Sequence, residues 1–144
     1  MIFYIIQLYM DPELWGPKLW FFLHTVSFEY EPTTNSKREY AIFFNSIKSI
    51  LPCNICKTHF VEFLKTNPIE KNLESKESLI KWVLACHNNV NRSNNKAEWT
   101  YDDLVKHYTS IFKNDLYNKG TYKNLSLFLG LIILILLFVL VFLK

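Results

Sequence analysis

The C-terminal twenty residues, LSLFLGLIILILLFVLVFLK (125–144), leave this part of the chain few structural choices, because they carry no charge before the last residue. At about 1.5 Å rise per residue, nineteen helical residues cover about 28 Å, close to the ~30 Å hydrocarbon core of a bilayer. A helix with no polar face suits lipid better than water. We therefore predict a transmembrane tail anchor at 125–143. Lys113, Lys119 and Lys123 precede it, which favours a domain that faces the cytosol.

The rest of the chain has the composition of one helical domain. Roughly 120 residues are enough for a single core, and only three Gly and five Pro argue against a turn-rich β architecture. The net charge of +3 is spread along the chain, so we expect no nucleic-acid partner. We expect an apolar extension at 1–11, which is too short to span a membrane, a globular domain at 12–113 and a linker at 114–124.

Helical periodicity continues through the globular domain, without a βαβ alternation or an internal repeat. Asp11 and Pro12 form a suitable start for a first helix. We expect Pro17 to lie in its first turn, or the helix to start at Pro17. Four further helices are expected at about 34–50, 53–65, 75–91 and 100–112, the last of them short. The predicted fold is therefore all-α: a four-helix bundle plus a short fifth helix, with a C-terminal transmembrane helix.

The segment LPCNICKTHF (51–60) holds two of the three cysteines. In the first turn of a helix, unpaired amides and the helix dipole favour a thiolate, and residues three apart share one face. Cys53 and Cys56 therefore suit a redox-active disulfide. Inert core packing is one alternative. Another is a zinc site, for which the ligands would be Cys53, Cys56, His59 and either Cys86 or His87.

Two other segments, WGPKLWFFLH (15–24) and HNNVNRSNNK (87–96), contain more Trp, His and Asn than a bundle core needs. Each residue alone has an ordinary structural explanation. Trp20 can be a core aromatic residue, His24 a hydrogen-bonded core histidine, and the asparagines a helix end and loop.

Taken together, the ordered motifs WGxxxWxxLH, PCxxC and Wx4HNxVNx4K resemble the Erv/ALR family of FAD-dependent sulfhydryl oxidases, in particular its short members in large cytoplasmic DNA viruses. The resemblance covers about residues 12–112 and implies a helical bundle that holds FAD between its helices, often as a homodimer. The positions that match the cofactor-binding residues of the family are Trp15, Gly16, Trp20, His24, His87, Asn88, Val90, Asn91, Lys96, His107 and Tyr108.

The same resemblance implies the chemistry. A thiol-containing partner protein, such as a thioredoxin-like or small CxxC carrier protein, would attack the catalytic Cys53–Cys56 disulfide at Cys53. Cys56 would pass two electrons to FAD, and O₂ would accept them to give H₂O₂. No metal is expected. On a host-cell or virion membrane, such an enzyme would form disulfides for viral assembly in a reducing cytosol.

The chain also departs from the family pattern. The second, structural disulfide of larger members is absent, since Leu84 and about Tyr101 stand at its positions. Cys86 is expected to pack as a small apolar residue. There are no shuttle cysteines, so partner proteins would have to reach Cys53 directly. Leu51 replaces an aromatic residue, which removes one expected flavin contact.

Overall fold

The computed structural model describes the backbone of residues 11–142, together with the side chains of that range except those of 116–118, 122 and 134–142. The chain divides into two units, Met1–Tyr101 and Asp102–Lys144, which are described separately below. The residues within this description form helices and no strand. The prediction of an all-α fold is therefore confirmed.

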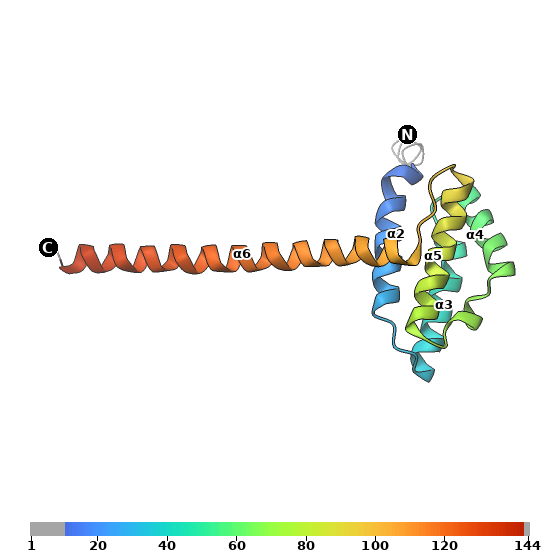
Figure 1. Ribbon diagram of the computed structural model, residues 1–144, viewed down its shortest axis with the longest axis horizontal. Coiled ribbons are helices and arrows are strands. Elements are labelled where there is room, and N and C mark those ends of the chain that lie inside the picture. Colours follow the sequence, from blue (N-terminus) through green and yellow to red (C-terminus); the bar gives the residue numbers. More distant parts are fainter. Residues whose placement is uncertain (1–10, 143–144) are drawn as a thin grey trace, which may run out of the picture. The chain divides into compact units, whose positions relative to one another are not determined.

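Residues 11–101, the described part of the first unit, form four helices and one short 3-10 turn (Figure 1): α2 (Pro12–Phe28), α3 (Thr34–Ile50), α4 (Asn54–Thr66), η1 (Ile69–Asn72) and α5 (Lys76–Ser93). The residue before each α-helix caps it, because its side chain accepts a hydrogen bond from an amide of the first turn; these residues are Asp11, Thr33, Cys53 and Ser75. Helix α3 ends where Leu51 turns extended ahead of Pro52. The predicted start of α2 and the predicted bounds of α3, α4 and α5 are confirmed to within about two residues.

Pro17 differs from its prediction. Because α2 begins at Pro12, Pro17 lies beyond the first turn and inside the helix. It removes the amide that would otherwise bond to the carbonyl of Glu13. The Asp11 carboxylate separately caps the helix start, where it accepts the amide of Glu13 at 2.9 Å.

One apolar core connects the four helices, built around large side chains such as Phe44, Phe63 and Trp82. Two buried polar groups fix the loops onto this core. The Tyr30 hydroxyl donates to the carbonyl of Leu73 at 2.7 Å, and the indole nitrogen of Trp82 donates to a loop carbonyl at 2.9 Å. Burial of each large apolar side chain contributes about 1.5–3 kcal/mol, so the core holds the bundle together.

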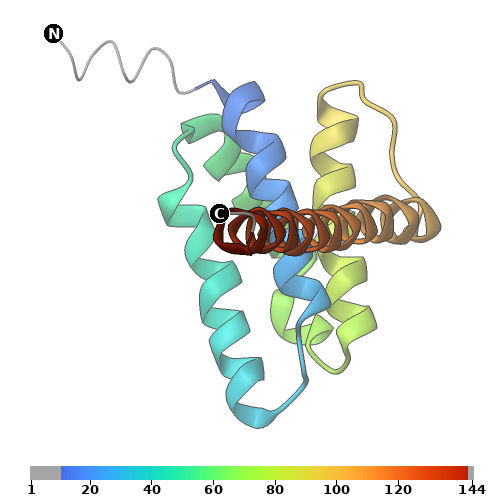
Figure 2. The same ribbon diagram turned by 90° about the vertical axis from the view of Figure 1, so that its left-hand side faces the viewer.

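The direction of the helices decides where the sequence motifs meet. Successive helices run up and down, so the N-terminus of α2, the N-terminus of α4 and the C-terminus of α5 lie at one end of the bundle, as Figures 1 and 2 show. Cys53 and Cys56 stand at the start of α4, and the 87–96 motif closes α5. The topology therefore gathers all three motifs toward one end.

In the second unit the structure describes one helix, α6 (Tyr101–Phe142). Figure 1 draws it as one uninterrupted helix. The prediction of a short fifth helix is wrong in its extent, since the helix continues through the predicted linker at 114–124. No proline follows Tyr101 to stop it. An ion pair between Asp115 and Lys119, one turn apart at 2.6 Å, adds to the helix in that segment.

Within the described residues, no helix offers a stretch that is long and apolar enough to cross a membrane. Much of the predicted anchor at 125–143 lies outside the described residues, because the side chains of 134–142 and the whole of residue 143 are not described.

Candidate functional site

The first element of the site is a disulfide in the first turn of α4. Cys53 and Cys56 are bonded to each other, with their Cα atoms 5.2 Å apart. Cys53 is also the N-cap, since its sulfur accepts the amide of Cys56 at 3.1 Å. No acidic residue stands in this first turn. On reduction, free amides and the helix dipole would stabilise a thiolate here.

The second element is a cluster of aromatic rings from α2 and α5. The ring of His87 stacks on Trp20, with centroids 4.3 Å apart and planes 10° apart. His87 Nδ1 lies 3.0 Å from Nε2 of His24, which has no exposed surface. One of these nitrogens donates and the other accepts, so the two neutral imidazoles hold the same tautomer, either both protonated on Nδ1 or both on Nε2. The cluster joins the WGxxxWxxLH and HNxVN motifs through direct contacts.

Electrostatics keep His87 neutral. Burial, together with a smaller contribution from the positive charge of Lys96, lowers its pKa from 6.5 to about 4. At neutral pH the ring therefore acts as one hydrogen-bond donor and one acceptor. It can position a ligand by hydrogen bonds without adding charge.

This pKa predicts a pH-dependent stability. Between pH 4 and 6.5 the unfolded chain binds a proton at His87 and the folded chain does not, so the free energy of unfolding rises with pH across this window. We expect the melting temperature to fall from pH 7 to pH 5, and to fall less in His87→Gln. Thermal melts at both pH values measure the difference. An identical fall in both proteins would contradict the assignment.

The C-terminus of α5 ends in a structured turn. Asn95 adopts a positive φ of 54°, and the amides of Asn95 and Lys96 bond back to the carbonyls of Arg92 and Asn91 at 3.2 and 2.8 Å. This is a Schellman motif with asparagine in the left-handed position. Asn94 and Asn95 therefore end helix α5, which is the structural role that the sequence analysis gave as the alternative to ligand binding.

Asn88 has a structural partner that the sequence did not reveal. Its side-chain amide pairs with the backbone of Trp99, donating to the carbonyl at 2.8 Å and accepting the amide at 2.9 Å. A two-bond ion pair from Arg92 to Glu98 holds the same loop. The loop thereby brings the Trp99 ring within 5.8 Å of the His87 ring. Sequence analysis missed Trp99; its only signal was a fourth tryptophan shortly after the HNxVN motif.

Two observations test whether this region suits a flavin. Asn91 is only 8% exposed, and no described residue makes a hydrogen bond to its side chain. The amide therefore keeps donor and acceptor groups that a polar ligand atom can use. At Gly16, a Cβ would meet no atom within 4 Å, so packing within the described chain does not require glycine there. Together with the Trp20–His87 stack, these features fit a flat, polar-edged cofactor.

The remaining predicted residues are distributed between the two units. In the first unit, Trp15 packs half-buried against the core, Val90 is half-buried near the end of α5, and the Lys96 side chain is exposed. His107 and Tyr108 belong to the second unit, where their rings meet edge to face at 5.3 Å. The structure thus brings Trp20, His24 and His87 into contact within one unit.

The zinc alternative finds no support. The sulfurs of Cys53 and Cys56 are bonded to each other, and the described residues contain no group of three or more His, Cys, Asp or Glu that could hold a metal ion. Cys86 is a free thiol in the core, and burial raises its pKa to about 12. The thiol therefore stays protonated and packs as a small apolar residue, as predicted.

Comparison with known proteins gives consistent matches. Residues 17–110 match the model of the Erv1 / Alr family. A probable FAD-linked sulfhydryl oxidase of Acanthamoeba polyphaga mimivirus is 37% identical over 100 residues, which are 67% of this chain and 70% of that protein. A FAD-linked sulfhydryl oxidase of African swine fever virus is 35% identical over 73% of this chain and 89% of its own length. The FAD-binding domain of Erv1 from Saccharomyces cerevisiae superposes with a TM-score of 0.65 at 32% identity, covering 71% of this chain and 97% of that domain.

Proposed function

Because this chain belongs to the Erv1/Alr family, we propose that it is a FAD-linked sulfhydryl oxidase that converts dithiols to disulfides and O₂ to H₂O₂. The observation that carries the proposal is the disulfide at the start of α4, at the end of the bundle toward which the α2 and α5 motifs converge. Relatives of similar length carry the same activity in their names. The substrates are thiol-containing proteins, and the electron acceptor is O₂.

The chain's own residues perform the thiol exchange. A substrate thiolate attacks the Cys53 sulfur, the S–S bond breaks, and Cys56 leaves as a thiolate that the helix N-terminus stabilises. The second substrate thiol then displaces Cys53 from the mixed disulfide, so the substrate loses two electrons and two protons. Cys53 is the attacked sulfur because Cys56 packs against the core. When bound, FAD would supply a two-electron acceptor for the reduced Cys53–Cys56 pair and a route for the electrons to O₂.

The residues that would hold FAD in the first unit surround the Trp20–His87 stack. His87 and Asn91 would offer hydrogen bonds to polar edges, and Lys96 would offer positive charge to the phosphates or the ring. Asn88 would act indirectly, since its amide already holds Trp99. Trp15, Gly16, His24 and Val90 would shape the pocket.

A second copy of the chain is the proposed partner of the α2–α3 face. Leu14, Phe22 and Ile42 are each more than half exposed on these two helices. A pocket of about 230 Å³, lined by residues that include Phe22, Val26 and Phe43, lies on this face and could receive a side chain of the second copy. Apolar surface of this kind suits a homodimer interface. The molar mass in solution tests this, with Phe22→Glu expected to give a monomer.

The activity itself is tested by stoichiometry. Purified protein with FAD should consume one O₂ and release one H₂O₂ for each dithiol oxidised, as the electron balance requires. An oxygen electrode and a peroxide assay measure both quantities in one sample. A folded, FAD-loaded protein that leaves dithiols reduced in air would refute the proposal.

The apolar C-terminal segment supports a membrane location. We propose that 125–143 anchors the enzyme, with its catalytic domain facing the cytosol, and that it forms disulfides in virion proteins during viral assembly. The support is the uncharged sequence of the segment, the lysines ahead of it, and the viral relatives.

Deletion of residues 125–144 is therefore expected to release the enzyme from membranes and leave turnover of a small dithiol within about twofold. Oxidation of a membrane-tethered protein should slow about tenfold or more, because anchoring on one surface raises the effective concentration. Membrane flotation and initial rates measure both effects. Protection of the catalytic domain from protease in intact vesicles would contradict the cytosolic orientation.

A further inference from the structure

We propose that a groove between α4 and α5 binds the stretch of substrate polypeptide that flanks the attacking cysteine. The inference deepens the proposed function and rests on it, since it requires a protein dithiol as substrate. The groove has a volume of about 510 Å³, within the ~300–1,000 Å³ typical of ligand clefts. Its walls come from the two helices and from Glu98 in the loop after α5.

One stripe of α4 leads from the groove toward the disulfide. Ile55, His59, Glu62 and Thr66 follow each other at i, i+4, i+7 and i+11, so they share a helix face. The last three line the groove, and Ile55, which stands between the two cysteines, is 69% exposed. Eleven helical residues rise about 16 Å, the length of about five residues of extended chain. A peptide held in the groove would therefore reach the cysteines.

The lining suits a polypeptide better than a charged small molecule. Phe63 gives an apolar floor, while the side chains of His59 and Asn89 make no hydrogen bond to any described residue and can pair with peptide groups. Among the described lining residues, Arg92 is the only lysine or arginine, and Glu98 pairs with it through bonds of 2.9 and 2.7 Å. An anionic ligand such as a nucleotide would find the charge of Arg92 already paired with Glu98, and the carboxylate of Glu62 would repel it.

The region at the disulfide has a different charge. Residues 40–61 contain no Asp or Glu, and Lys48 and Lys57 lie in this segment. The positive charge of these two lysines attracts the thiolate form of the substrate cysteine. The expected occupant is thus an extended, largely uncharged segment that carries its cysteine thiolate to the end of α4.

Filling the groove tests the proposal. Ala85 is exposed on α5 and lines the groove, so Ala85→Trp obstructs it without removing a hydrogen bond. The probes are dithiothreitol and a synthetic dithiol peptide with several residues on each side of a C-x-x-C pair. We expect kcat/KM for the peptide to fall about tenfold, mostly through KM, and kcat/KM for dithiothreitol to stay within about twofold.

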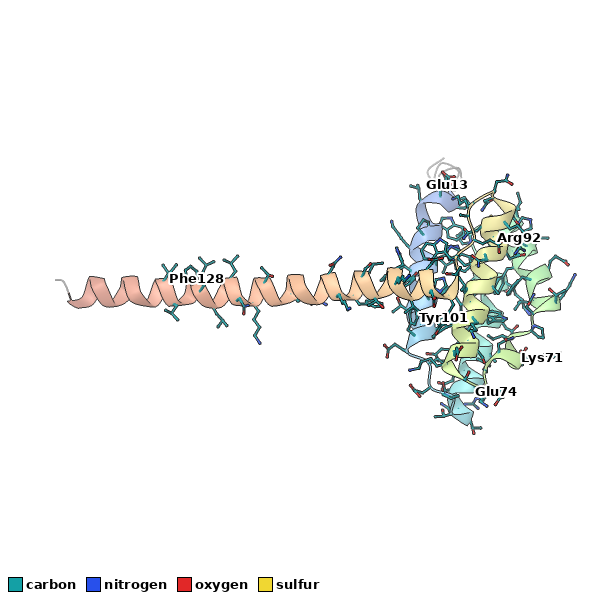
Figure 3. All side chains as sticks on the ribbon, viewed as in Figure 1. Glu13, Lys71, Glu74, Arg92, Tyr101 and Phe128 are labelled. Carbon is teal, nitrogen blue, oxygen red and sulfur yellow. A yellow bond between two sulfur atoms is a disulfide. The ribbon has the colours of Figure 1, made fainter. Side chains whose placement is uncertain are left out.

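Two further variants make the result specific. Lys71→Trp adds the same ring to an exposed position in η1, at the opposite end of the bundle from Arg92 (Figure 3), and should leave both substrates unaffected. Asn89→Ala should lower only peptide turnover, by a few fold. Unchanged peptide kinetics in Ala85→Trp, or an equal loss on both substrates at unchanged FAD content, would overturn the groove. A wild-type protein that oxidises neither probe would instead overturn the proposed function.

Discussion

Replacement of Cys53 or of Cys56 by serine is expected to lower dithiol-dependent oxygen consumption at least about a hundredfold and to leave FAD bound. Each variant keeps one sulfur, so no disulfide can accept the substrate's electrons. Neither cysteine belongs to the Trp20–His24–His87 cluster, so cofactor retention should not change. Oxygen uptake and the FAD-to-protein ratio, measured on the same preparation, check both parts.

Cys86→Ala is the matched control, because Cys86 is the free cysteine in the core and stays protonated. It should retain most activity and lose about 1 kcal/mol or somewhat more of stability. An inactive Cys86→Ala protein beside an active Cys53→Ser protein would show that the redox pair is misassigned.

Removal of the His87 or Asn91 side chain should have the second-largest effect, on FAD affinity. Each change to alanine would leave polar cofactor atoms without a partner, which costs about 1–3 kcal/mol, or about a 5- to 150-fold rise in Kd. His87→Ala should be the more severe change, since it also removes the stack on Trp20 and the bond to His24. Flavin fluorescence titration of the apoprotein gives the Kd.

His59→Ala provides the comparison, because His59 is an exposed histidine on α4 that makes no contact with the cluster. Its FAD affinity should equal that of the wild type. If His87→Ala and Asn91→Ala also bind FAD like the wild type, the HNxVN segment serves only as a helix terminus.

The helix bounds of the first unit follow from short-range signals. Asp11, Thr33 and Ser75 are N-caps whose side-chain bonds depend only on neighbours, and Pro52 ends α3 by its own geometry. The convergence of the motifs follows in turn from helices of similar length that alternate in direction. These features could be predicted from the sequence because each depends on few residues.

Other features depend on contacts that local pattern does not encode. The pairing of Asn88 with Trp99 spans eleven residues and a loop, so the sequence alone could not separate a structural amide from a ligand-binding one. The α4–α5 groove depends on how two helix faces are spaced. The length of α6 was missed because a polar segment with a glycine resembles a linker, although no proline interrupts it.

The visible absorption spectrum of the purified protein, recorded before and after an anaerobic addition of dithiothreitol, tests the proposed oxidase most directly. We predict the bands of oxidised flavin, which bleach when the dithiol reduces the protein and return when air is admitted. Cys56→Ser should show the same bands without rapid bleaching. A folded protein that stays colourless when offered excess FAD, or a flavin that the dithiol does not reduce, would contradict the account.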